Sequence, residues 1–397
     1  SNGQKGNVPK LRFPGFEGEW ENTELGNLAF YGKEKTRVRK NHFVSTENIE
    51  QNFGGIVPFE DSETMVDGTG FTKGDILIAN IRPYLKKIWQ SDMDGACNAD
   101  VLVLKPQEID NVFLYFLVAQ NKFIDYVMGG VKGSKMPRGD KAHILQYNTA
   151  IPSILEQQQI AKFLSLLSNR IAAQKELIET LKKYKRGLLS SMFPEKGEAI
   201  PKHRFSGFTE PWEQRKLGKI AGNVIGGGTP KTSVAEYWDG SIPWIQSSNV
   251  QENEMFEFEI PKSITQLGLD KSAAKLIPQN SIAIVTHVGV GKLVFVPFPY
   301  ATSQDFTSLA ELKTDAKFTC YSLYRRIQND LHIVQGSAIK GITKEDLLTK
   351  EIMVPEIEEQ KKIGEYFRRF DRLITLHQCK LDISVKIKSG LLQQLFI

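Results

Sequence analysis

Cysteine and long apolar segments are both scarce in this chain of 397 residues. Its three cysteines, Cys97, Cys320 and Cys379, are odd in number and far apart, which excludes a disulfide framework and a Cys-x-x-Cys metal site. No apolar run approaches the roughly 18 residues that a membrane helix needs, and the first ten residues are too polar for a signal peptide. We therefore expect a cytoplasmic protein with no membrane partner.

Catalytic signatures are missing as well. The six histidines form no His-Glu-x-x-His, and the chain has neither a Gly-x-Ser-x-Gly elbow nor the Asn/Asp-Pro-Pro-Tyr/Phe of adenine methyltransferases. The glycine-rich segments Gly226–Thr232 and Val288–Leu293 lack the Gly-Lys-Ser/Thr of a phosphate loop. We interpret both as tight turns, or as loops that let the backbone approach another polymer. These absences predict a binding protein that has no catalytic residues, metal site or cofactor of its own.

The chain is an internal repeat. Residues 9–29 return as residues 201–221, with eleven of 21 positions identical at an offset of 192. Residues 152–193 return as residues 355–396, with twelve of 42 positions identical at an offset of 203. Between these shared segments, residues 30–151 and 222–354 have little in common. The order is a variable unit, a shared segment, a second variable unit and a second shared segment.

The longer shared segment predicts a helix of about 38 residues, or roughly 57 Å, in each repeat. Apolar residues recur at alternating steps of three and four, with polar breaks at Gln174 and Lys185 and at His377, Ser384 and Lys388. A helix this long cannot bury its apolar stripe within one small domain. We expect the two helices to pair antiparallel as a coiled coil.

The variable units predict mixed α/β domains. Short β-rich runs at 74–81, 99–104, 281–285 and 293–298 predict strands, and residues 111–128 and 317–334 predict helices. A last strand leads into each long helix. The predicted fold class is α+β, with domains at 1–151 and 194–354 and spacer helices at 152–193 and 355–397. Two divergent copies acquire a pseudo-twofold axis, which suits two copies of one partner and a bipartite, asymmetric DNA site.

Basic and polar loops supply the candidate DNA contacts. The net charge of +5 permits a nucleic-acid partner, lysine-bearing glycine loops suit phosphate, and Arg, Asn and Gln suit base edges. In the first unit the candidates are Lys33, Lys35, Arg37, Arg39, Lys40, Asn80, Arg82, Tyr84, Lys86, Lys132, Lys135 and Arg138. In the second they are Thr229, Lys231, Ser247, Ser248, Asn249, His287, Lys292, Ser303, Gln304 and Lys340.

These segments together resemble the specificity subunit of type I restriction-modification systems. The likeness rests on residues 226–250 (GGGTPKTSVAEYWDGSIPWIQSSNV), 74–84 (GDILIANIRPY), the repeated Pro-x-x-x-Glu-Gln-x-x-Ile and the repeated Gly-Leu-Leu-x-x-hydrophobe-Phe. The first unit departs from it, because it lacks Gly-Gly-Thr-Pro and Ile-Pro-Trp-Ile.

The resemblance implies a non-catalytic subunit whose two target-recognition domains each read one half of a split double-stranded DNA site. Two methyltransferase subunits would dock on it and methylate adenine N6 with S-adenosylmethionine. Two restriction-translocase subunits, driven by ATP with Mg²⁺, would cleave. S-adenosylmethionine, ATP and Mg²⁺ are thus expected on the partners, and no cofactor is expected on this chain.

Two other hypotheses stay open at this point. One is a coiled-coil scaffold that joins proteins and carries its basic loops incidentally. The other is a solitary nuclease or methyltransferase with degenerate motifs.

Overall fold

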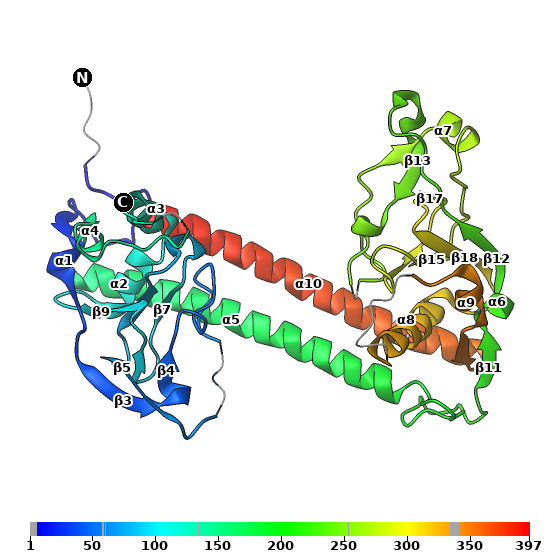
Figure 1. The fold of residues 1–397 in the computed structure, drawn as a ribbon, viewed down its shortest axis with the longest axis horizontal. Helices are drawn as coiled ribbons and strands as arrows, with labels where there is room; N and C mark the ends of the chain where they lie inside the picture. Colours follow the sequence, from blue (N-terminus) through cyan, green and yellow to red (C-terminus); the bar gives the residue numbers. More distant parts are fainter. Residues whose placement is uncertain (1–5, 58, 60, 134, 253, 334–340) are drawn as a thin grey trace. The chain divides into compact units, whose positions relative to one another are not determined.

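A computed structural model describes residues 6–57, 59, 61–133, 135–252, 254–333 and 341–397. The chain divides into two compact units. Unit 1 comprises residues 1–175 and 380–397, and unit 2 comprises residues 176–379. Two long helices, α5 (Ile154–Ser191) and α10 (Ile357–Leu395), contribute to both units (Figure 1). Their 38 and 39 residues confirm the predicted helices, and each unit contains the start of one and the end of the other.

Unit 1 contains two four-stranded sheets, with strand orders β2-β9-β6-β7 and β3-β5-β8-β4. A separate antiparallel pair, β1 with β10, leads into α5. The strands are β1 (Glu21–Glu24), β2 (Ala29–Tyr31), β3 (Lys35–Arg39), β4 (Phe43–Val44), β5 (Met65–Phe71), β6 (Ile76–Ala79), β7 (Ile88–Gln90), β8 (Gly95–Cys97), β9 (Val101–Pro106) and β10 (Asn148–Ile151). The short helices are α1 (Leu25–Leu28), α2 (Asn111–Val118), α3 (Asn121–Gly129) and α4 (Lys141–Leu145).

We call β2-β9-β6-β7 the inner sheet of unit 1 and β3-β5-β8-β4 the outer sheet. The inner sheet is buried on both faces. Along β6, Ile76 and Ile78 join the core that includes α2, α3 and the long helices, whereas Leu77 joins a second core shared with the outer sheet. Successive side chains of a strand point to opposite faces, so a strand covered on both sides needs a continuous apolar run. This explains the apolar run at 74–81. The strand β3 belongs to the outer sheet.

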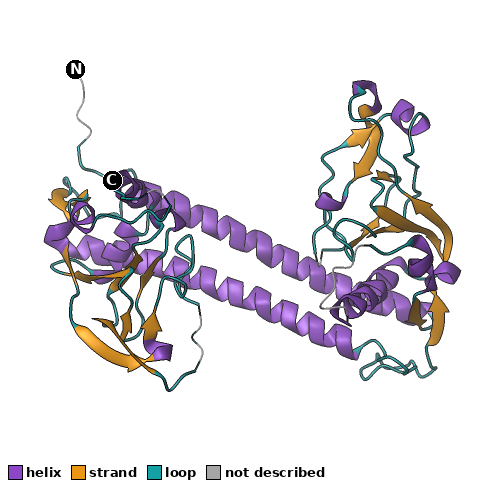
Figure 2. Cartoon of the chain, in the orientation of Figure 1, coloured by secondary structure: helices purple, strands orange, loops and turns teal. Residues whose placement is uncertain are grey.

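Unit 2 repeats this organisation with a four-stranded sheet (β12-β18-β15-β16), a three-stranded sheet (β14-β13-β17) and the pair β11 with β19. The strands are β11 (Glu213–Lys216), β12 (Ala221–Gly226), β13 (Trp238–Ile245), β14 (Ser263–Ile264), β15 (Ser281–Val285), β16 (Leu293–Val296), β17 (Ala301–Thr302), β18 (Phe306–Leu312) and β19 (Glu351–Val354). The helices are α6 (Leu217–Ile220), α7 (Gln266–Asp270), α8 (Ala316–Ile333) and α9 (Lys344–Thr349). Figure 2 shows the strands confined to the two units and the long helices uninterrupted.

The shared segments make the same contacts in both units. The Arg12 guanidinium binds Glu156 with two hydrogen bonds of 2.9 and 2.8 Å, and Arg204 binds Glu359 with two of 2.8 Å. The aromatic contacts repeat as well. Phe396 packs on Trp20 and Phe113 in unit 1, as Phe193 packs on Trp212 and Phe318 in unit 2.

The repeated Pro-x-x-x-Glu-Gln motif joins each long helix to its unit. Gln157 accepts a hydrogen bond from the backbone N–H of Asp110 at 3.0 Å, and Gln360 accepts one from Asp315 at 2.9 Å. The Asp110 carboxylate in turn accepts from the N–H of Phe113 at the start of α2, and Asp315 accepts from that of Phe318 in α8. Asp110 and Asp315, Phe113 and Phe318 are therefore equivalent positions, at an offset of 205.

The predicted strands at 74–81, 99–104, 281–285 and 293–298 are confirmed as β6, β9, β15 and β16. The single helix predicted over 111–128 is wrong. The chain turns extended at Gln120 (φ −132°, ψ 153°), which separates α2 from α3. The Gln120 side chain donates a hydrogen bond to the carbonyl of Phe116 at 2.9 Å. This side-chain amide replaces a hydrogen bond that a backbone N–H would donate if the helix continued. The helix predicted over 317–334 is α8, and position 334 lies outside the described residues.

Candidate nucleic-acid interface

Three of the predicted basic residues share one face of β3. Lys35, Arg37 and Arg39 alternate along the strand and are exposed, so their side chains project to the same side. Carboxylates balance them only in part: Arg39 lies 3.5 Å from Glu63, which precedes β5, and Arg37 is paired in register with Asp67 of β5. Lys33 and Lys40, also exposed, lie just before and just after the strand. The result is a basic strand at the outer sheet of unit 1.

A second basic group forms where two loops of unit 1 meet. Arg82 donates its backbone N–H to Pro137 at 2.8 Å, and Ile81 pairs with Arg138. Arg82 has a left-handed backbone (φ 52°). Its side chain is exposed, as are those of Lys132, Lys135 and Arg138. Arg138 binds Asp100 at 3.0 Å. The structure thus brings together residues that are about 55 positions apart in the sequence.

Asp140 anchors the lysine-bearing loop of that group. Its carboxylate accepts from Lys132 and from the backbone N–H groups of Ala142 and His143 at the start of α4. The Lys132 hydrogen bond, followed by those two N–H groups, lowers the pKa of Asp140 to about 2. The loop therefore stays anchored by a carboxylate throughout the neutral range.

The other candidates of unit 1 are placed differently. Asn80 is 9% exposed, and its side-chain oxygen, next to Gly139, is buried without a hydrogen-bond partner among the described residues. Tyr84 is 48% exposed at the tip of its loop. Lys86 is half-buried and lines a cavity that also borders α2 and α10. Of Asn80, Tyr84 and Lys86, Tyr84 is therefore the most accessible to a large polymer.

In unit 2 the glycine-rich loop is a packed turn, as the sequence suggested. Gly228 donates to the carbonyl of Thr302 at 2.8 Å, and a side chain at Gly227 would meet the Ser303 carbonyl at 1.9 Å. The turn brings the Thr229 hydroxyl to the side chain of Gln304. Thr229 and Gln304, 75 positions apart, are thereby joined, and Lys231 follows them on the exposed side.

The remaining candidates of unit 2 are spread over three loops. Ser247, Ser248 and Asn249 form a short 3-10 turn after β13, in which Asn249 accepts from the N–H of Gln246. His287 is exposed and Lys292 half-buried on the β15–β16 loop. Ser303 is 4% exposed and bonded to Asp305, so its hydroxyl is turned inward. Lys340 lies outside the described residues.

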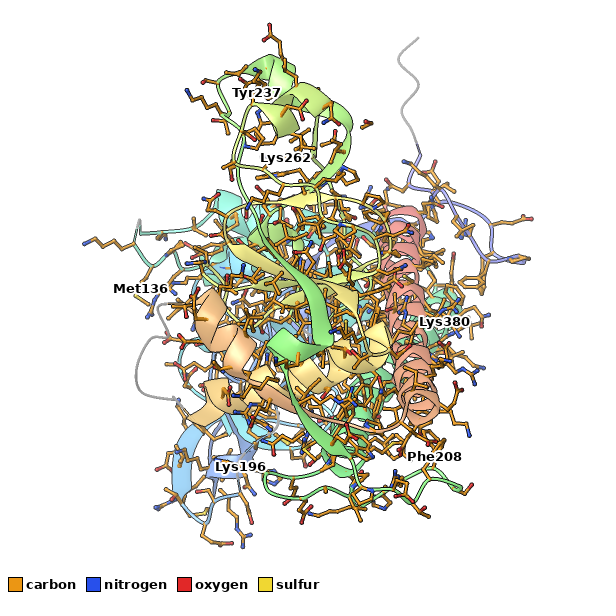
Figure 3. The ribbon with its side chains drawn as sticks, turned by 90° about the vertical axis from the view of Figure 1, so that its right-hand side faces the viewer. Met136, Lys196, Phe208, Tyr237, Lys262 and Lys380 are labelled. Atoms are coloured by element: carbon orange, nitrogen blue, oxygen red, sulfur yellow. The ribbon has the colours of Figure 1, made fainter. Side chains whose placement is uncertain are left out.

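Sequence reasoning missed one feature of unit 2. The exposed ammonium of Lys262 lies 5.9 Å from the ring centres of both Trp238 and Trp244. Figure 3 shows Lys262 and Tyr237 in the lobe formed by β13, β14 and α7. Two tryptophans six positions apart in one strand could have drawn attention to this lobe, but the lysine that stacks on them comes from another segment.

Within the described ranges, no three His, Cys, Asp or Glu side chains are grouped so that they could hold a metal ion. Nor does any helix in that part of the chain have the length and apolarity needed to cross a membrane.

One protein-family model matches each of the two repeats of the chain. A family model described as the type I restriction modification DNA specificity domain matches twice, over residues 17–183 and 209–386. The chain belongs to this specificity family. Structures of its members confirm the predicted fold class, two mixed α/β domains with two long helices.

This specificity-family chain has relatives in Methanocaldococcus jannaschii and Escherichia coli. It is 24% identical over 409 residues to the type I restriction enzyme MjaVIII specificity subunit of Methanocaldococcus jannaschii, covering 95% of the chain and 92% of the relative. It is 28% identical over 193 residues to the MjaIX specificity subunit of that organism, covering 47% and 44%. It is 31% identical over 169 residues to the EcoR124I/EcoR124II specificity subunit of Escherichia coli, covering 41% of each. In the last two the chain spans less than half of the relative's length.

Two solved structures share the fold of the specificity-family chain. The type I restriction-modification system S subunit from M. genitalium has a TM-score of 0.64 at 14% identity and covers 98% of this chain and 99% of its own. A chain from a structure on complex assembly and conformational transition of the type I R-M system has a TM-score of 0.58 at 18% identity, covering 95% and 97%.

Proposed function

We propose that this chain is the DNA-recognition subunit of a type I restriction-modification complex and that each unit reads one half of a bipartite, asymmetric site. The observation that carries the proposal is the duplication itself. Two units have identical contacts where the shared segments meet, but different loops and outer sheets. Two units that share the same contacts but carry different loops suit two half-sites of different sequence.

The basic strand of unit 1 and the loops around Arg82 and Arg138 supply phosphate and base contacts in this proposal. Arginine can bind a guanine edge with two hydrogen bonds, and exposed lysines suit the backbone. In unit 2 the corresponding surface is more polar and aromatic, with Thr229, Gln304 and the lysine-stacked tryptophans. The two half-sites therefore differ in the chemistry that reads them.

Chemistry is assigned to partners. Methyltransferase subunits with S-adenosylmethionine would methylate adenine N6, and restriction-translocase subunits with ATP and Mg²⁺ would cleave, while this chain in the cytoplasm supplies the sequence choice. An adenine that must leave the base stack to be methylated is better presented when both flanks are held. The chain itself acts without catalysis.

The decisive experiment is methylome sequencing of cells that carry this chain with its methyltransferase partner. We expect N6-methyladenine in a two-part motif with a fixed gap, lost when the gene for this chain is deleted. Methylation that persists after the deletion would contradict the proposal. A scaffold would bind the methyltransferase but give no preference among random duplexes in electrophoretic binding, and S-adenosylmethionine binding by the isolated chain would instead favour a solitary methyltransferase.

A further inference from the structure

Each unit places a lysine of a long helix against an aromatic ring of the neighbouring helix. In unit 2 the ammonium of Lys185 lies 5.4 Å from the ring centre of Tyr321. In unit 1 the ammonium of Lys388 lies 5.4 Å from the ring centre of Phe116. Lys185 and Lys388 are equivalent at the offset of 203, and Tyr321 and Phe116 at the offset of 205 that relates α8 to α2. The two lysines thus occupy the same place in their units.

Their electrostatic surroundings differ. Lys185 is 8% exposed and forms an ion pair with Asp371, whose second oxygen accepts from the Tyr321 hydroxyl. In unit 1 the position of Asp371 holds Ser168, and the phenol of Tyr321 is replaced by Phe116. Ser168 donates instead to the carbonyl of Leu164 in its own helix. Within the described part of the chain, Lys388 has no carboxylate partner.

Lys388 also borders a cavity of about 670 Å³ in unit 1. Three further lysines line it, Lys86, Lys122 and Lys175, and its lining has one carboxylate side chain, that of Asp125. Lys122 is engaged by the carbonyl of Ile397 at 2.7 Å. Partial burial, and then the charge of Lys175, lower the pKa of Lys388. A cavity with excess positive charge, and with a lysine that has no carboxylate partner among the described residues, favours an anionic occupant.

Unit 2 closes the corresponding helix surface with its own residues. Phe256 packs on Tyr321 with ring centres 5.5 Å apart, and Arg368 lies over Phe256 while binding Glu257 at 2.6 Å. In unit 1 the helix position of Arg368 is Ser165. At the three positions compared, unit 2 has two charged side chains and a phenol, whereas unit 1 has two serines and a phenylalanine.

We infer that the cavity of unit 1 receives an acidic side chain of the methyltransferase subunit, which takes the place that Asp371 fills in unit 2. A carboxylate is favoured because it is what the equivalent lysine binds. A protein source is favoured over DNA because the walls come mainly from α2, α3 and the shared helices, whereas the basic strand lies in the outer sheet. The inference rests on the proposed function and adds that the two units bind their methyltransferase copies unequally.

The test rebuilds the ion pair of unit 2 inside unit 1. In the full chain, Ser168→Asp should raise the unfolding midpoint, because Lys388 gains a partner, and Ser168→Asn should not. In titrations with the methyltransferase subunit, Ser168→Asp should weaken one of two binding steps by about tenfold or more, the scale of one buried charge pair across an interface. Lys388→Met should weaken the same step, and Ser168→Asn should match the unchanged chain.

Three results would overturn the inference. If Ser168→Asp and Lys388→Met both bind the methyltransferase as the unchanged chain does, the cavity does not receive its side chain. If both variants keep that affinity but the assembled complex loses affinity for DNA, the cavity holds phosphate. If the unchanged chain binds no methyltransferase at all, the proposed function fails and the inference fails with it. The Lys388→Met variant keeps the test valid should Ser168→Asp fail to fold.

Discussion

Arg12 and Arg204 show how much of the architecture depends on single side chains. Each forms a bidentate ion pair with a glutamate in the first turn of a long helix. Those glutamates, Glu156 and Glu359, are 1% and 0% exposed. A buried charge is costly unless it is paired. Each arginine therefore fixes the shared segment that precedes the variable region to the helix that follows that region.

We predict that Arg12→Met destabilises unit 1 by about 3–5 kcal/mol, because it leaves Glu156 buried without a partner. Urea unfolding of the full chain measures this. The double variant Arg12→Met with Glu156→Met should recover most of the loss, since replacing both charges removes the unpaired one. A matched exposed pair, Lys182 with Glu179, should change stability by less than about 0.5 kcal/mol when Lys182 becomes Met. Equal losses at both pairs would show that burial is not the cause.

At the scale of elements, β3 is the clearest DNA-facing candidate. Replacing Lys33, Lys35, Arg37 and Arg39 together with Ala should weaken binding to every duplex and reduce the salt slope by up to about one unit for each lost phosphate contact. Replacing the exposed Lys162, Lys183, Lys202 and Lys219 removes the same charge elsewhere. Binding measured at several salt concentrations compares the two. An equal salt slope in the two variants would assign β3 to a solvated surface.

We also predict that the two long helices set the gap between the half-sites. The contact of Lys185 with Asp371 gives the register of the pair, so residues 179–182 lie opposite residues 374–377. Removing both segments shortens each helix by roughly 6 Å, close to two base-pair steps, and nearly preserves the apolar stripe.

Methylome sequencing of that double deletion should give unchanged half-sites with a shorter gap. Methylation at the original gap would mean that the helices do not set the spacing. Deleting only 179–182 is the matched control, since it breaks the register and should cost stability.

At the scale of the whole molecule, the two variable units are predicted to act independently. Exchanging residues 30–151 for those of a relative should change one half of the methylated motif and leave the other unchanged. The contact of Arg12 with Glu156 lies outside the exchanged segment, and Gln157 binds a backbone N–H at position 110, so the shared contacts should survive. Alteration of both halves would contradict modular reading.

The sequence predicted the architecture well because repeats and periodicity are properties of the chain itself. The strand predicted at 281–285 is β15, and apolar spacing predicted the two long helices at about their observed length. Burial of Asn80 and Ser303 could not be predicted, because their residue types are equally at home on an exposed loop. Lys185 and Lys388 were visible as polar breaks, but only the packed structure shows that one faces a carboxylate and the other a cavity.

The division of the chain into units also orders the events of its synthesis. Unit 2 is a continuous segment, so all its residues have been synthesised before the last turns of α10 are made. Unit 1 is split, and its core waits for Leu395 and Phe396, which pack beside Trp20 and Phe113. The domain that begins first therefore finishes last, with an apolar surface that stays open while about 200 residues are added at some 5–20 per second. Premature termination anywhere after unit 2 would leave one unit whole and the other without its closing side chains.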